Sequence, residues 1–277
     1  MELFVIIFGL TAALCWGTAD FSGGFATKRS GVLTVAIISQ ATGIILLIAA
    51  ALAFSESVPS TTDMLWGASA GLAGGMGVLA LYHALSVEKM GIVAPVTAVM
   101  SALIPVVFGM ITEGLPDTSQ LIGFLFALIG VWLISRDHES SKIELQKLKL
   151  PCLAGTGFGM FMILIDQVQA EGIFWPLVGA RMATIPTFII VAYFMKQTKV
   201  PDIRYLPIIL LAGIFDTGGN LFYALAAQAG RLDIAAVLTS LYPAVTVLLA
   251  WMFLKEKLVY RQWAGIIFTM AAVVLIA

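Results

Sequence analysis

Long apolar segments, separated by short polar connections, follow one another along the whole chain. Each is close to the length of about 20 residues that a helix needs to cross the hydrocarbon core of a bilayer. There are ten such segments, at approximately residues 3–24, 33–54, 65–86, 92–112, 119–135, 150–170, 173–194, 205–227, 234–254 and 261–277. The pattern therefore predicts an all-α integral membrane protein with ten transmembrane helices.

A second pattern is a repeat at a constant offset of 142 residues. When residues 71–134 are laid over residues 213–276 without gaps, 15 of the 64 pairs are identical, and the first of them is Gly71 with Gly213. An apolar composition alone would give roughly five identities. Paired repeats in a chain with many spans are the usual architecture of a secondary transporter.

The repeat divides the chain into two halves. Each half has five predicted helices, and because five is an odd number, the second half must cross the membrane in the opposite direction to the first. We expect two inverted five-helix repeats at residues 1–136 and 150–277, joined by a polar cytoplasmic linker at residues 137–149.

Composition agrees with a membrane protein. Hydrophobic residues make up 60% of the chain and charged residues 11%, and the mean hydropathy is +1.02. A soluble globular protein has roughly half apolar and a quarter charged residues. Little chain remains outside the apolar segments, which leaves no room for a soluble catalytic domain.

The basic residues are distributed unevenly between the two sides of the predicted membrane. Of the 15 lysines and arginines, 13 fall in alternate loops, whereas Arg231 lies on the opposite side and Arg181 lies inside a helix. Loops rich in lysine and arginine stay in the cytoplasm. We therefore expect a multi-pass protein of the cell membrane with both termini outside.

Two ionisable residues deep within apolar segments are candidates for function. Asp216 lies near the middle of the eighth helix, and Asn220 and Tyr223 follow on the same face at helical spacing. Arg181 lies in the seventh helix. A charge at membrane depth is costly unless it is paired or faces a water-filled cavity. Two interpretations remain open, a structural ion pair between Arg181 and Asp216, or a role in handling substrate or protons.

Two further acids lie closer to predicted helix ends. Asp20 follows Trp16 by one turn in the first helix, and Asp166 lies about five residues before the end of the sixth. They are either carboxylates that reach the membrane interface or groups that face a cavity.

Glycines and prolines indicate how the helices pack. Gly67, Gly71 and Gly75 form a stripe of small residues in the third helix, which allows another backbone to approach closely. Pro243 interrupts the hydrogen bonding of the ninth helix and predicts a kink within a single span.

The sequence lacks the combinations of residues that carry other functions. With two histidines and two cysteines in the chain, we find no nucleophile with a paired base, no metal-ligand cluster, no phosphate-binding loop and no basic patch for nucleic acid. We therefore expect no enzymatic activity, no cofactor, no bound metal and no nucleic-acid partner.

Several stretches resemble a known family. The run Leu14-Cys15-Trp16-Gly17-Thr18-Ala19-Asp20-Phe21 and the passage from Leu241-Tyr242-Pro243 to Trp251-Met252-Phe253-Leu254-Lys255-Glu256-Lys257, followed by Gln262 and Gly265, are similar to the ten-helix, EamA-type branch of the drug/metabolite transporter superfamily. The resemblance implies an inverted-repeat transporter with a central cavity shared by both halves. Familiar members commonly have both termini inside, whereas the basic loops here predict the opposite orientation.

These observations favour a secondary transporter or exporter of small metabolites such as amino acids or drugs, working by alternating access. A passive channel or facilitative pore is the alternative, in which buried acids would act as selectivity groups. The expected partners are a small, partly apolar substrate, the lipid bilayer and, as a candidate coupling ion, protons. Eight residues are expected to contact the substrate: Trp16, Asp20, Tyr82, Arg181, Asp216, Asn220, Tyr223 and Tyr242.

Overall fold

The computed structural model describes residues 2–87, 90–135, 148–196, 201–254 and 259–276. Within these residues all regular structure is helical: α1(Glu2–Ser30), α2(Val32–Ala53), α3(Thr61–Val87), α4(Met90–Thr112), α5(Thr118–Ser135), α6(Lys149–Asp166), α7(Phe174–Phe194), the short 3₁₀ helix η2(Ile203–Tyr205), α8(Leu206–Ala229), α9(Leu232–Thr239), α10(Tyr242–Leu254) and α11(Tyr260–Ile276). The predicted all-α fold is confirmed.

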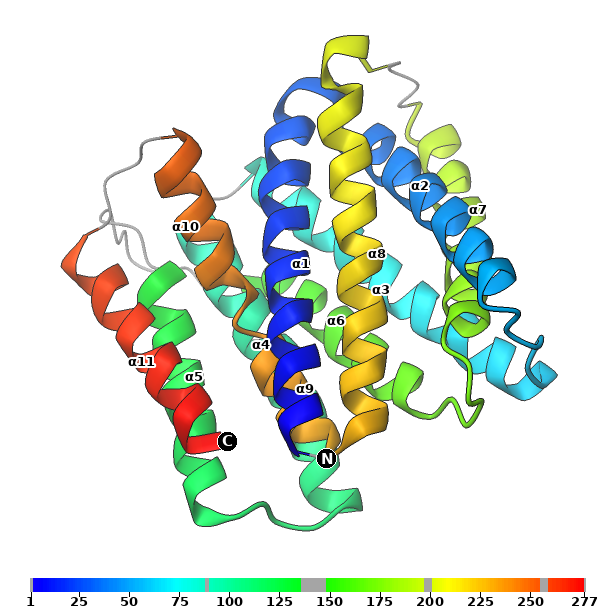
Figure 1. Cartoon of the computed structure of the whole chain (residues 1–277). Helices are drawn as coiled ribbons and strands as arrows, with labels where there is room; N and C mark the ends of the chain where they lie inside the picture. The colour runs from blue at the N-terminus through cyan, green and yellow to red at the C-terminus, as the bar shows by residue number, and fades with distance from the viewer. Residues whose placement is uncertain (1, 88–89, 136–147, 197–200, 255–258, 277) are drawn as a thin grey trace.

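Successive helices run in alternating directions across the bundle, so the first and last described residues lie at the same end (Figure 1). At the opposite end α1 finishes with Lys28 and Arg29, and η2, just before α8, carries Arg204. We call this the basic end. The end with the termini, where α2 finishes and α7 begins, carries Glu56 and Glu113, and we call it the acidic end.

The helices contact one another in pairs that join the two halves of the chain. α1 packs along α8, and α3 packs along α6; α2 contacts α7 and α8, and α3 contacts α7. α5 and α11 form a pair at one side of the bundle (Figure 1). The helices of the two halves are therefore interleaved, and the centre of the bundle lies between the halves.

Glycines set the closeness of these contacts. A Cβ atom added to Gly71 of α3 would meet the backbone of Ala180 in α7, and one added to Gly213 of α8 would meet the backbone of Ser39 in α2. Gly130 and Gly265 similarly bring α5 and α11 into backbone contact. The predicted role of the α3 glycine stripe in close packing is confirmed.

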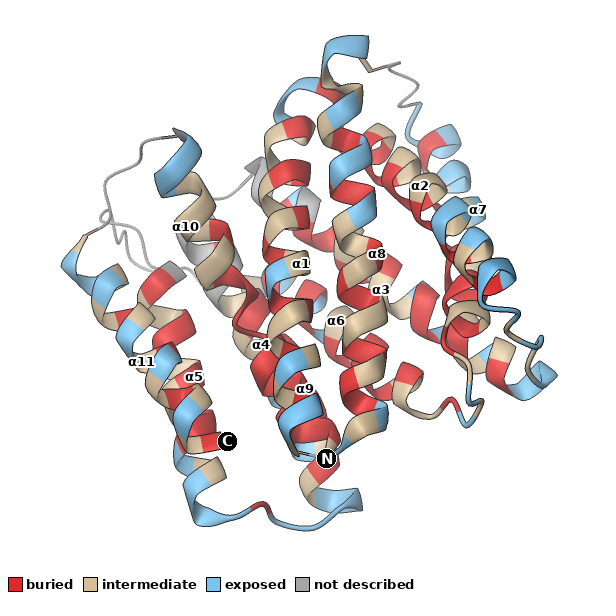
Figure 2. Cartoon of the chain, in the orientation of Figure 1, coloured by how far each residue is buried: buried red, intermediate tan, exposed pale blue. Residues whose placement is uncertain are grey.

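Apolar side chains cover the outer surface of the bundle. Ile45, Ile189, Ile267 and Val274 are among many large hydrophobic residues with more than half of their surface exposed, and exposed positions follow the outer faces of α2, α7 and α11 (Figure 2). In water such a surface would be unstable. Seven helical segments in the described part of the chain are long and apolar enough to cross a membrane, and three shorter apolar helices accompany them. The protein is a multi-pass membrane protein.

The structure corrects the prediction of one continuous ninth helix. The segment is broken between α9 and α10 at Ser240 and Leu241. Pro243 has no N–H to donate to Thr239, and the backbone turns through shorter bonds, of which Leu241 N to Leu238 O at 3.3 Å is one. The break places the backbone of Tyr242 at the middle of the bundle (Figure 1).

Two helix ends also differ from the prediction. α6 stops at Asp166 instead of residue 170, so this carboxylate lies at the helix terminus. α1 continues to Ser30, so Asp20 lies ten residues before the end of its helix and not near an interface.

Candidate functional site

A cavity of about 90 Å³ lies at the centre of the bundle, with its walls formed by α1, α2, α3, α4, α6, α7, α8 and α10. Since a cavity needs roughly 10 to 15 Å³ to hold one water, this space has room for several water molecules. Six of the eight predicted site residues line it: Trp16, Asp20, Arg181, Asp216, Asn220 and Tyr242. The structure thus brings together residues from both halves.

One wall of the cavity carries an ion pair. Nη2 of Arg181 lies 2.8 Å from Oδ2 of Asp216, and the two side chains are 8% and 25% exposed. Nη1 of Arg181 donates to Oε1 of Gln40, and Nε2 of Gln40 donates to Oδ2 of Asp216 at 3.4 Å. The predicted contact between Arg181 and Asp216 is present, and both charges are neutralised within a closed triangle.

Gln40 is a member of this triangle that the sequence analysis missed. It is the only amide side chain in the apolar segment that became α2, which is the signal that could have identified it. An amide can donate to a carboxylate and accept from a guanidinium at once, so Gln40 holds Arg181 and Asp216 in register. It is 4% exposed.

The start of α7 is fixed by a residue of another loop, which determines where Arg181 lies. Carboxylate oxygens of Glu56 accept hydrogen bonds from the backbone N–H groups of Ile173, Phe174 and Trp175 at 3.0, 3.2 and 2.9 Å. A carboxylate at a helix N-terminus satisfies donors that the helix leaves free and complements the helix dipole. Arg181 follows on the second turn.

Two polar side chains face the cavity without a partner. The Asp20 carboxylate makes no hydrogen bond or ion pair with any residue that the structure describes, and the same holds for the Asn220 side-chain amide. Asn220 is only 7% exposed. Buried polar groups normally have partners, so these two groups have only the contents of the cavity to interact with.

Three aromatic rings close the cavity toward the acidic end. Trp16 stacks on Tyr223 with ring centres 5.9 Å apart, and Phe161 contacts both at 6.3 Å. Tyr223 is completely buried, and its hydroxyl donates to the carbonyl of Met162 at 3.2 Å. We call Trp16, Phe161 and Tyr223 the aromatic floor.

The floor corrects the expectation for one residue and leaves another open. Tyr223 lies beneath the cavity and packs against Trp16 instead of lining the wall. Its ring is large enough to fill the space between α1, α6 and α8, and its hydroxyl already has a partner. The side chain of Tyr82 lies outside the described residues.

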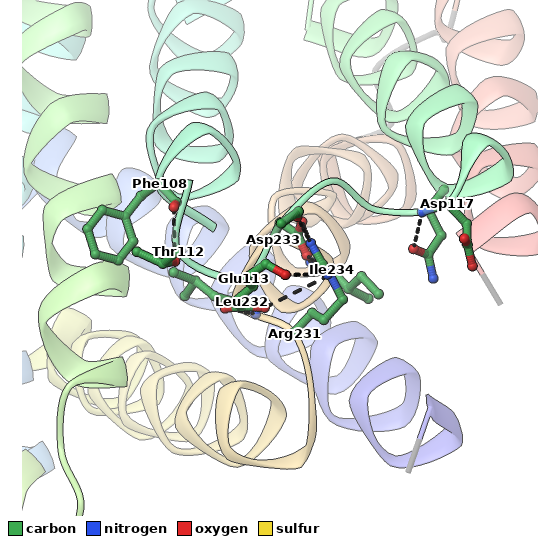
Figure 3. A network of polar contacts seen from close by, with 10 residues as sticks. Phe108, Thr112, Glu113, Asp117, Arg231, Leu232, Asp233 and Ile234 are labelled. Carbon is green, nitrogen blue, oxygen red and sulfur yellow. Dashed lines mark hydrogen bonds and ion pairs between the residues drawn. The ribbon is translucent and has the colours of Figure 1, made fainter. Parts of the chain in front are cut away.

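A polar network holds the helix ends together at the acidic end, below the floor. Arg231 donates to Asp233 through Nε at 3.1 Å and Nη2 at 2.8 Å, and Nη2 also donates to the carbonyl of Gly114 at 2.6 Å. The backbone N–H of Leu232 donates to Glu113 at 3.2 Å. Figure 3 shows these residues converging from the α4–α5 connection and the start of α9.

This network is electrostatically saturated. Asp233 is fully buried, and its hydrogen bond with Arg231 raises the pKa of the guanidinium above the ordinary arginine value. Arg231 therefore stays charged at any physiological pH, and the α4–α5 connection of the first half is tied to the α8–α9 connection of the second.

The part of the chain that the structure describes holds no group of three or more metal-ligating side chains. Asp166, the remaining acid of the sequence analysis, is absent from the cavity wall; its carboxylate accepts a long hydrogen bond from Gln167 at 3.5 Å.

Comparisons with known proteins agree with this architecture. The chain matches the EamA-like transporter family over residues 3–136 and again over residues 149–277. An uncharacterized protein of Methanocaldococcus jannaschii is 28% identical over 121 residues, which are 44% of this chain and 87% of that protein. That relative is therefore about half as long and corresponds to one repeat. A solved crystal structure superposes with a TM-score of 0.81 at 16% identity, covering 98% of this chain and 95% of the other, which shows a shared fold.

Proposed function

The chain belongs to the EamA-like transporter family of the drug/metabolite transporter superfamily, and on that premise we propose that it is a secondary carrier for a small, partly apolar solute, working by alternating access in the cell membrane. The observation that carries this proposal is the central cavity, in which Asp20 and Asn220 are unpaired among aromatic walls. A bound solute is the partner that these groups lack.

The inverted relation of the two halves is supported by contacts that recur at the repeat offset of 142 residues. The ring of Trp16 in α1 covers Gly219 in α8, and the ring of Phe158 in α6 covers Gly77 in α3. Adding 142 to Trp16 and Gly77 gives the second pair. Repeat mates in consecutive five-helix halves run in opposite directions (Figure 1), as alternating access between inverted halves requires.

Closure at one end favours a carrier over a channel. A channel needs a continuous path when it is open. Here the aromatic floor and the Arg231 network both lie on the acidic side of the cavity, so one conformation blocks that side. Moving the α8–α9 connection away from Glu113 and Gly114 would be the corresponding opening step.

The carrier is distinguished from a passive pore by counterflow. Purified protein is first screened by thermal unfolding against small metabolites, because a ligand of the folded state raises the apparent stability. The ligand found is then tested in proteoliposomes. We expect saturable uptake that is accelerated when unlabelled ligand is loaded inside. Uptake that rises linearly with concentration and ignores internal ligand would instead identify a pore.

Asn220→Ala is expected to weaken transport without harming the fold. The amide lies in the cavity and holds no other residue, so its loss removes only a contact to the solute. A neutral hydrogen bond contributes about 1 kcal/mol, which corresponds to a roughly threefold to tenfold rise in KM. Gln228→Ala, at the exposed end of the same helix, is the matched control. Unchanged transport in Asn220→Ala would remove this residue from the proposed site.

Both termini are expected outside the cytoplasm, because Lys28, Arg29 and Arg204 gather at the opposite end of the bundle. Paired reporters fused after Ala277 test this. A reporter active only outside the cytoplasm should give signal, whereas one active only in the cytoplasm should not. The reverse result would invert the proposed orientation.

A further inference from the structure

We propose that the substrate is an organic cation, an amine or quaternary ammonium group attached to an apolar or aromatic body, and that Asp20 is its counter-ion. The inference rests on the proposed carrier function and adds a charge to the substrate. It comes from the charge balance of the cavity wall and from the residues that surround the one unpaired charge.

The charges that line the cavity do not cancel. Among its described lining residues three carry charge, Asp20, Arg181 and Asp216. Arg181 is held by Asp216 at 2.8 Å and by Gln40, and these contacts occupy its guanidinium. One negative charge, that of Asp20, remains without compensation.

An uncompensated carboxylate at this depth requires water or a cation. Asp20 lies ten residues from the end of α1, and Asp216 is close enough for the two negative charges to repel each other. Leaving a charge unpaired at membrane depth costs several kcal/mol. Binding a cation removes this cost, whereas binding an anion increases it.

The remaining wall suits the body of such a cation. Trp16 lies one helical turn from Asp20 on the same face, Tyr242 lies near enough to feel its charge, and Phe158 and Phe161 complete the aromatic surface. The faces of aromatic rings attract cations and repel anions. A carboxylate-bearing solute would also find no free cation, because Arg181 is already paired.

A series of phenethyl compounds that differ in charge tests the inference on the full-length protein. Phenethylamine and phenethyltrimethylammonium are cations, 2-phenylethanol is neutral, and phenylacetate is an anion of similar size. We expect the two cations to raise the unfolding temperature in a saturable manner and the alcohol and the carboxylate to have little effect. The quaternary compound keeps its charge at every pH, so its response does not depend on its own titration.

Variants then locate the counter-ion. Asp20→Asn should weaken binding of phenethyltrimethylammonium about tenfold or more, since removing one member of a partly buried charge pair costs at least about 1.4 kcal/mol. Asp20→Glu should retain most of the affinity. Asp166→Asn neutralises another acid near a helix end that does not line the cavity, and it should bind as the wild type does.

Several results would overturn the inference: equal or tighter binding of the alcohol or the carboxylate, no saturable response to either cation at millimolar concentration, or full affinity in Asp20→Asn. The comparison within the wild type stands even where a variant fails to fold. Counterflow of a neutral or anionic solute with no response to cations would contradict the substrate class alone. Cation binding without counterflow would contradict the carrier and leave the ligand class in place.

Discussion

Gly71→Ala is expected to destabilise the folded protein by roughly 2 to 3 kcal/mol and to abolish most transport. The added methyl group would lie 2.5 Å from Cα of Ala180 and 2.6 Å from its carbonyl carbon. Both are backbone atoms, so relief requires that α7 moves away from α3. That shift displaces Arg181, the next residue along α7, from Gln40 and Asp216.

The same substitution elsewhere has the opposite sign, which makes the effect specific. Gly24 lies in α1 with no atom within 4 Å of the position that a Cβ would take. Alanine is a better helix former than glycine by about 1 kcal/mol, so Gly24→Ala should leave stability unchanged or raise it slightly. Thermal unfolding of both variants in detergent provides the measurement. Equal unfolding temperatures for the two would contradict the close α3–α7 contact.

The Arg181 and Asp216 pair gives the second large effect, in a double-mutant cycle. Arg181→Met should destabilise the protein by about 2 to 3 kcal/mol. This is less than the 3 to 5 kcal/mol typical of a fully buried pair, because Asp216 is 25% exposed to the cavity. Asp216→Leu should cost slightly more, since it leaves the 8%-exposed guanidinium with Gln40 as its remaining partner.

The double variant Arg181→Met with Asp216→Leu is expected to be more stable than either single variant. Replacing both partners with apolar groups removes the buried charges as well as their attraction, and this is often nearly neutral. Denaturant unfolding of the three variants and the wild type gives the coupling energy, expected at about 1 to 3 kcal/mol. A double variant that unfolds as readily as the weaker single would show that the two charges do not stabilise each other.

Helix positions follow from the sequence because their cause is local. A backbone in lipid must satisfy its own hydrogen bonds, so a run of about 20 apolar residues has one outcome. α2 was predicted at 33–54 and found at Val32–Ala53, and α7 was predicted at 173–194 and found at Phe174–Phe194. The repeat and the family resemblance are likewise visible in the chain itself, because both depend on which residues recur and not on where they lie.

Helix ends and breaks were less predictable. The sequence showed that Pro243 would disturb the ninth segment, but a proline in a membrane helix produces either a kink or an interruption according to which neighbours satisfy the freed carbonyls. Here Thr246 donates to the carbonyl of Gly17 in α1 at 3.1 Å, and the segment separates into α9 and α10. That contact joins positions 229 residues apart in the chain.

The sequence by itself established an all-helical membrane protein with two homologous halves and a small set of polar residues at membrane depth. Only the tertiary structure decided how those residues are used: Arg181 pairs with Asp216, Gln40 completes the triangle, Tyr223 lies in the floor, and Asp20 stays unpaired in the cavity. The reason is that membrane insertion depends on the hydropathy of one segment at a time, whereas the partner of a side chain depends on which helix faces meet, and that is determined by packing between residues far apart in the sequence.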